Sequence, residues 1–219
     1  MDLLPTEIRV LGCLLEKQRT TPETYPLTLN ALRAACNQST NRDPVVSYDD
    51  ATVRDALTRL GQRRFTRLSG AGRAPKFRHL LDESLPMSPA ARAVLTVLML
   101  RGPQTPGELK LRAERMQPLA DLAAVHAALD ELIGAQLARR LDRRPGQKEE
   151  RYVQLLSEDA DWEERLAPAP SAAPIAAVPL PASGPAPGPA SRDDERLAQI
   201  EAEVAELRRE VAELKALIE

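Results

Sequence analysis

Hydrophobic positions along residues 4–156 follow the same pattern twice. One helical run recurs 84 positions later, as Val10, Leu11, Leu14 and Leu15 and then Val94, Leu95, Leu98 and Met99. Another recurs 72 positions later, as Val53, Ala56, Leu57 and Leu60 and then Val125, Ala128, Leu129 and Leu132. Both runs have the period of one helix face, so the chain is predicted to fold as two similar units in tandem. Thr21-Pro22 also recurs, as Thr105-Pro106, and about 12 extra residues are assigned to the first copy.

Each copy is predicted to contain three helices followed by a two-stranded hairpin. In the first copy the helices are expected near residues 6–18, 27–36 and 49–63, and the strands near 65–68 and 76–80. In the second copy the helices are expected near residues 88–100, 105–112 and 121–134, and the strands near 137–141 and 151–155. Three helices closed by a hairpin are typical of the winged form of the helix-turn-helix.

This order predicts a fold that is mainly α with small β-hairpins (α+β), arranged as tandem winged-helix domains. The first domain is expected over residues 1–84 and the second over residues 85–156. The alternative is a plain helical protein with incidental turns. Hairpin signals at equivalent positions of both copies favour the winged-helix interpretation.

A different period governs residues 192–219. Apolar residues alternate there at spacings of three and four, which is the seam of a left-handed coiled coil. Mostly β-branched residues at a positions and leucine at most d positions favour two parallel strands. The seam residues, expected to mediate dimerisation, are Leu197, Ile200, Val204, Leu207, Val211, Leu214 and Ile218. The alternative is a single solvated helix, but the pattern favours a homodimer.

Residues 157–191 are expected to separate the winged-helix domains from the coiled coil. An acidic segment comes first, and residues 167–190 then hold eight prolines, so this stretch is predicted to be an extended linker. The sign of the net charge also changes between the predicted domains and the residues that follow them. Residues 1–156 carry 24 Lys or Arg against 18 Asp or Glu, whereas residues 157–219 carry 6 against 14. A basic body with an acidic tail permits a polyanion as partner.

Positive charge is most concentrated on the third helix and hairpin of the first copy. Residues 54–80 include eight Lys or Arg and one acid, Asp55. In a winged helix the outward face of the third helix enters the major groove and the hairpin touches phosphate. The candidate DNA-binding residues are therefore Arg54, Thr58, Arg59, Gln62, Arg63, Arg73 and Lys76. Asp55 and the absence of interleaved aromatic residues argue against DNA, and some of the arginines are alternatively expected to pair with nearby acids.

The third helix of the second copy carries no Lys or Arg. Its outward ridge holds small residues, which allow another surface to approach closely. Ala123, Ala127 and Gly134 are therefore candidates for a protein interaction.

No motif for catalysis, a metal or a cofactor is found in the sequence. Cys13 and Cys36 lie beside apolar residues in predicted helices and are expected to fill the core. His79 and His126 complete no zinc-ligand spacing and lie in no motif for a catalytic base. We expect a protein that is not an enzyme and binds no metal or cofactor. The start lacks a basic signal-peptide region and no apolar run reaches membrane-spanning length, so a cytoplasmic protein without a membrane partner is expected.

Several longer motifs resemble the bacterial YceH-like proteins of unassigned function. They lie at residues 12–18, 20–27, 35–45 and 100–109, and the resemblance covers roughly residues 4–156. It implies a tandem winged-helix body, sometimes followed by a short coiled coil, and no catalytic or cofactor residue. Residues 36–45 suit helix capping and turns, but their Asn41-Arg42-Asp43-Pro44 motif is more particular than a turn requires. The resemblance therefore also suggests a functional surface there.

The leading hypothesis is a dimeric tandem winged-helix protein that binds double-stranded DNA in a regulatory role, with contact through the first domain. The coiled coil would raise the effective concentration of the second body once the first has bound. The alternative is a scaffold that uses its winged helices to bind a protein whose identity the sequence does not reveal, without DNA contact. Asp55 and the small residues of the second copy favour that alternative.

Overall fold

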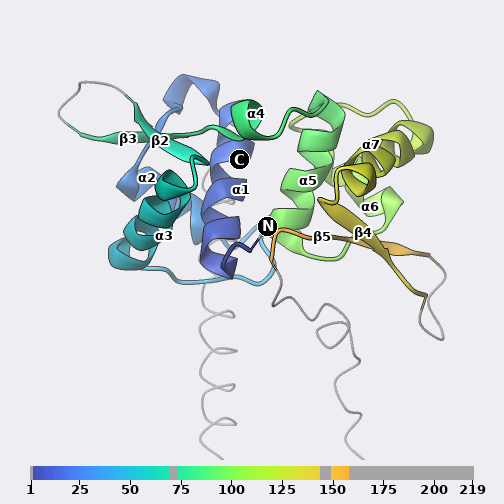
Figure 1. Ribbon diagram of the computed structural model, residues 1–219, viewed down its shortest axis with the longest axis horizontal. Helices are drawn as coiled ribbons and strands as arrows, with labels where there is room; N and C mark the ends of the chain where they lie inside the picture. The colour runs from blue at the N-terminus through green and yellow to red at the C-terminus, as the bar shows by residue number, and fades with distance from the viewer. Residues whose placement is uncertain (1, 70–73, 144–148, 158–219) are drawn as a thin grey trace, which may run out of the picture. The chain divides into compact units, whose positions relative to one another are not determined.

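The computed structural model describes residues 2–69, 74–143 and 149–157 (Figure 1). The predicted linker and coiled coil, with all seven seam residues, lie outside these ranges, and so does Arg73. The described part is α+β, with seven α-helices and small antiparallel sheets. Among the described residues, no helix is both long enough and apolar enough to cross a bilayer.

The predicted repeat of three helices and a hairpin is present in the element order. The first half contains α1 (Pro5–Thr20), η1 (Pro22–Thr24), β1 (Leu27–Thr28), α2 (Leu29–Cys36), α3 (Asp50–Gln62), β2 (Thr66–Ser69), β3 (Lys76–His79) and α4 (Leu81–Ser84). The second half contains α5 (Pro89–Arg101), α6 (Pro106–Ala113), α7 (Leu122–Gly134), β4 (Ala138–Leu141) and β5 (Arg151–Gln154). The boundary predicted between residues 84 and 85 falls between α4 and α5.

The start of the second helix differs from the prediction. Residues 27 and 28 form β1, which pairs antiparallel with β3, so the first sheet has the order β1-β3-β2. Helix α2 begins two residues later, where the Thr28 hydroxyl accepts a hydrogen bond from the backbone N–H of Ala31. Thr105 caps α6 in the same way, through the N–H of Glu108.

This capping shows that the structural counterpart of Thr105 is Thr28 rather than Thr21. Thr21-Pro22 instead opens η1, which has no counterpart among the described elements of the second half. The extra residues of the first copy are therefore divided between η1 and the connection from α2 to α3.

Helices α1 and α5 lie side by side at the centre of the described residues (Figure 1). Gly12 allows α1 to approach α5 closely, because a Cβ there would lie 3.0 Å from Leu100 Cδ2 and 3.3 Å from Met99 Cβ. The described residues of both halves belong to one compact unit. A backbone hydrogen bond of 2.7 Å from Leu3 N–H to the Leu156 carbonyl also ties the start of the first half to the end of the second.

Candidate nucleic-acid interface

Helix α3 presents its polar face to solvent. Asp49 caps its N-terminus, because the carboxylate accepts a hydrogen bond of 2.8 Å from the N–H of Thr52. The predicted core residues are buried, namely Val53, Ala56, Leu57 and Leu60. The exposed side chains are those of Arg54, Asp55, Thr58, Arg59, Gln62 and Arg63. The fold therefore brings the helical members of the predicted DNA-binding set together on one surface, with Asp55 among them.

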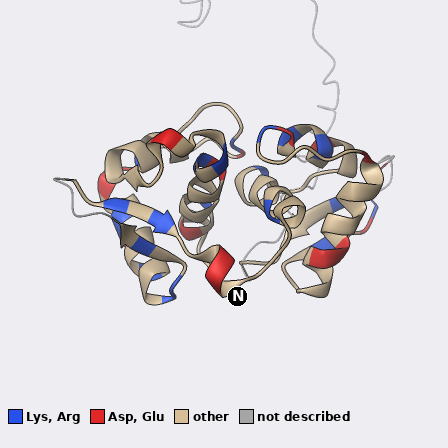
Figure 2. Ribbon diagram, turned by 90° about the horizontal axis from the view of Figure 1, so that it is seen from above, with Lys and Arg blue, Asp and Glu red and all other residues tan. Residues whose placement is uncertain are grey.

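The β2–β3 hairpin extends this surface. Lys76 is exposed and pairs across the strands with Ser69. Arg67 lies directly opposite Arg78, and like charges at opposed positions of an antiparallel pair are destabilising. Arg78 forms an ion pair of 3.2 Å with Glu83, whereas Arg67 has no ion pair with a described residue. Figure 2 shows Lys and Arg positions in blue along this hairpin. An anion near Arg67 would reduce the repulsion.

The candidate side chains differ in how free they are to contact a ligand. Arg54, Arg59 and Lys76 make no side-chain hydrogen bond or ion pair with the described residues, and neither does Gln62. The Thr58 hydroxyl donates to the Arg54 carbonyl at 2.9 Å, which leaves only its acceptor lone pairs available. Arg63 donates to the Asp2 carbonyl, so contact with a phosphate would compete with that bond.

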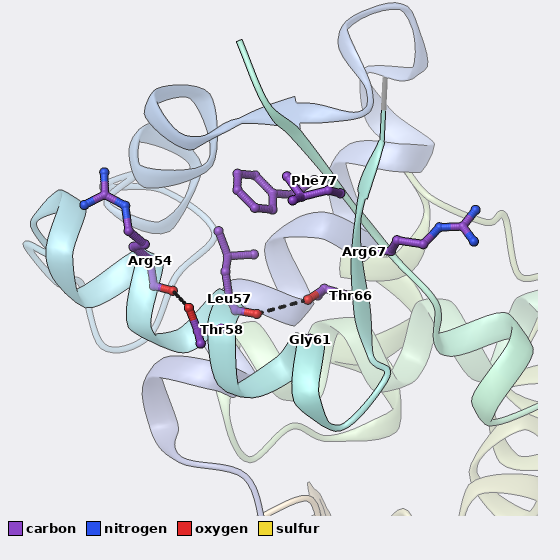
Figure 3. Close-up of a pocket in the computed structure, with 8 residues that line it drawn as sticks. Arg54, Leu57, Thr58, Gly61, Thr66, Arg67 and Phe77 are labelled. Atoms are coloured by element: carbon purple, nitrogen blue, oxygen red, sulfur yellow. Dashed lines mark hydrogen bonds between the residues drawn. The ribbon is translucent and has the colours of Figure 1, made fainter. Parts of the chain in front are cut away.

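A pocket of about 250 Å³ opens between α3 and the hairpin. Leu57 and Phe77 face one another in it, whereas Arg54 and Arg67 extend to opposite sides (Figure 3). Leu68, which is 61% exposed, also lines it. The pocket is therefore apolar inside. Arg54 lies at one side of it, whereas Arg67 projects from the face of β2 opposite to that of Leu68.

The corresponding surface of the second half has a different character. Ala123, Ala127 and Gly134 are all exposed on α7, which carries no Lys or Arg. Two large apolar side chains of α7, Leu122 and Ile133, are exposed as well. On the hairpin, Arg140 and Arg143 form ion pairs of 3.4 and 3.7 Å with Glu150. This face combines an apolar helix with a hairpin whose positive charge is partly compensated.

The connection from α2 to α3 carries a buried ion pair that no sequence signal revealed. Arg42 Nη2 lies 2.6 Å from Glu16 Oε2, and both side chains are 0% exposed. A second hydrogen bond of 2.9 Å joins Arg42 Nη1 to Glu16 Oε1, and Arg115, which follows α6, pairs with the same carboxylate. Burial acts to raise the pKa of Glu16, but the hydrogen bonds and charge of Arg42 outweigh it and lower the pKa.

Neighbouring residues of this connection join the two halves. The Asp43 N–H donates to the Leu100 carbonyl at 2.9 Å, and Asn41 Oδ1 accepts a hydrogen bond of 2.7 Å from Arg101. From α1, Arg9 donates to the Pro44 carbonyl at 2.6 Å. The motif at residues 41–44 thus has a structural role at the junction between the halves, which explains why it is more particular than a turn requires.

The described residues include no group of three or more His, Cys, Asp or Glu side chains able to hold a metal ion. Cys13 and Cys36 are free and buried, as predicted for residues that fill the core. His79, the last residue of β3, is buried, whereas His126 is exposed on α7.

Comparison with known proteins places the chain in a family. Residues 3–147 match the family model described as "Protein of unknown function, DUF480". The chain belongs to the DUF480 family. A UPF0502 protein of Geotalea uraniireducens is 47% identical over 95% of this chain and 91% of its own length. Another, of Geobacter metallireducens, is 54% identical over 74% of this chain and 76% of its own length.

The resemblance that the sequence motifs carry, to a bacterial family of unassigned function, is therefore confirmed. The DUF480 match spans both halves of the described fold, up to residue 147. A UPF0502 protein of Pelobacter propionicus is 47% identical in an alignment that covers 100% of this chain and 96% of its own length. Similarity to the UPF0502 proteins thus extends into the C-terminal residues as well.

Proposed function

We propose that this DUF480 protein binds double-stranded DNA through α3 and the β2–β3 hairpin, as a dimeric tandem winged-helix protein with a regulatory role. One observation carries the proposal. The cations Arg54, Arg59, Arg67 and Lys76 lie exposed on adjoining elements without an ion pair in the described part of the chain. Exposed cations without an ion pair are available to replace the counterions of a phosphate backbone.

In complexes of winged-helix proteins with DNA, the third helix contacts bases and the hairpin contacts phosphates, and α3 and the β2–β3 hairpin suit these two kinds of contact. With α3 in the major groove, the Gln62 amide is placed to meet an adenine edge, and the arginines of α3 reach guanine or phosphate. The hairpin supplies Arg67 and Lys76 to phosphates, where they give affinity without sequence preference. Asp55 repels phosphate, but its carboxylate accepts a hydrogen bond from the amino group of cytosine.

Salt-dependent DNA binding tests this proposal. Fluorescence anisotropy of labelled duplex DNA, titrated from about 50 to about 300 mM salt, should show affinity falling steeply as salt rises. The double variant Arg54→Glu and Arg59→Glu should bind more weakly, and the slope of log affinity against log salt should become shallower by about 2, because two phosphate contacts are lost.

A matched control separates this surface from general electrostatics. Arg140→Glu with Arg143→Glu makes the same change of charge on the second hairpin, where both arginines already pair with Glu150. DNA affinity of this variant should stay close to that of the parent protein. An equal loss of DNA affinity in both variants would contradict the assignment of the DNA contact to α3. No binding by the parent protein at the lowest salt would refute DNA binding altogether.

A protein-binding scaffold is the second candidate function, and the α7 face favours it. Leu122 and Ile133 are exposed beside the small residues of that helix, and apolar side chains without charge suit a protein surface better than DNA. A photo-crosslinking residue at Ala127 should capture one defined partner in cells, whereas the same residue at the exposed position Arg19 should not. Identical products from both positions would contradict a specific interface on α7.

A further inference from the structure

The pocket between α3 and the hairpin contains more apolar surface than a DNA-phosphate contact uses. Leu57, Leu68 and Phe77 line it together. These apolar side chains gain no stabilisation from contact with a phosphate. They do stabilise a bound apolar group, because both apolar surfaces are then removed from water. The lining therefore suits a ligand with an apolar body.

The polar groups of the pocket indicate the charge of that ligand. The hydroxyls of Thr58 and Thr66 both donate to backbone carbonyls, at 2.9 Å to Arg54 and 3.4 Å to Leu57. The remaining side-chain donor at the pocket is the guanidinium group of Arg54, because Arg67 projects from the face of β2 opposite to that of Thr66 (Figure 3). Arg54 has no ion pair with a described residue, so it can turn over the opening without breaking one.

We propose that this pocket binds a small organic carboxylate whose apolar body packs between Leu57 and Phe77 and whose charge is held by Arg54. The volume of about 250 Å³ is below the roughly 300–1,000 Å³ of sites for drug-sized ligands. The apolar body is accordingly of the size of a bicyclic aromatic ring or a medium-length alkyl chain. A guanidinium group is the side chain best matched to a carboxylate, because its donors form a planar fork.

Binding in this pocket would occupy a residue that the proposed function assigns to DNA. Arg54 cannot hold a carboxylate and a phosphate with the same donors, so the ligand and DNA compete. This consequence rests on the proposed function, whereas binding of the carboxylate itself does not. The ligand would thus act as an effector that releases the protein from DNA.

Two kinds of variant test the pocket separately from DNA binding. Gly61 lies in the lining, and a Cβ there would meet only the Thr66 carbonyl and hydroxyl, at 4.0 Å. Gly61→Leu therefore fills the pocket without displacing backbone. Gly134→Leu is its matched control, because a Cβ at Gly134 has nothing within 4 Å. Arg54→Gln removes the charge and leaves the apolar lining, and Arg67→Gln, on the far face of β2, is its matched control.

The experiment is a titration of the full-length protein with 1-naphthoate, followed by amide chemical shifts in NMR without DNA. Shifts should concentrate on α3 and the hairpin. Binding should weaken about tenfold or more in Arg54→Gln but not in Arg67→Gln, since charged hydrogen bonds are lost only in the first. It should vanish in Gly61→Leu but not in Gly134→Leu. The neutral 1-naphthalenemethanol should bind at least about tenfold more weakly than 1-naphthoate.

Two outcomes would overturn the proposal. Equal binding of the neutral alcohol would show an apolar pocket without carboxylate recognition, and shifts that spare α3 and the hairpin would place the ligand elsewhere. Anisotropy with labelled DNA then tests the consequence, because 1-naphthoate should displace DNA from the parent protein and not from Gly61→Leu. Carboxylate binding without any DNA binding would refute the proposed function and leave the pocket assignment standing.

Discussion

At the scale of single residues, Glu16 is a buried charge that pairs with two arginines. Its buried carboxylate forms ion pairs with both Arg42 and Arg115. Arg42→Ala is expected to lower the free energy of unfolding by about 3–5 kcal/mol, because a buried carboxylate then loses its main partner. Arg115 is 39% exposed, so Arg115→Ala should cost about 1 kcal/mol or less. Urea unfolding measures both values. Losses of equal size would show that Arg42 is not the principal partner.

His79 makes the stability of the fold depend on pH. Its Nε2 lies 2.7 Å from Gln18 Oε1, and its Nδ1 accepts from the Leu81 N–H, an arrangement that requires the neutral ring. Burial lowers its pKa from 6.5 to about 4. The unfolded chain therefore takes up the proton first, and stability is lost as pH falls from 6.5 towards 4.

The expected loss over that interval is roughly 3 kcal/mol. Urea unfolding across the interval should show it in the parent protein. His79→Gln should lose most of this pH dependence, whereas His126→Gln, at an exposed position of α7, should retain it. A parent protein whose stability is flat between these pH values would contradict the burial of a neutral His79.

At the scale of elements, the approach of α1 to α5 depends on Gly12. A side chain there meets Leu100 and Met99, so Gly12→Val should lower the free energy of unfolding by about 1–3 kcal/mol through overpacking. Gly61→Val is the matched control on α3, since a Cβ at Gly61 has its nearest neighbour at 4.0 Å. It should change stability by no more than about 0.5 kcal/mol. Thermal and urea unfolding compare the two, and equal effects would contradict close packing at Gly12.

The elements also differ in how readily the sequence predicts them. Helices α3 and α7 have apolar residues at helical spacing and an aspartate cap, so both were predicted to within one or two residues. The two residues of β1 carry no strand signal of their own, because a strand this short forms only when β3 offers its edge. Local pattern therefore predicts the long elements, but not the short elements β1, η1 and α4.

At the scale of the whole molecule, the assembly predicted from residues 192–219 can be tested directly. Deleting these residues removes the proposed coiled-coil seam, so the mass in solution by light scattering should fall from that of a dimer to that of a monomer. DNA affinity should fall with it, because the second body no longer binds at a raised effective concentration. An unchanged mass would refute the coiled coil as the source of dimerisation.

The sequence by itself determined the repeat, the class of each long element, the buried faces of α3 and α7 and the positive charge of one face. These follow from spacing and local composition, which act over a few residues. Only the tertiary structure decided that Arg42 reaches Glu16, that Gly12 meets Leu100, and that Leu57 and Phe77 enclose a pocket beside Arg54. Such contacts join residues far apart in the chain, and a periodic pattern specifies which face is buried but not what it is buried against.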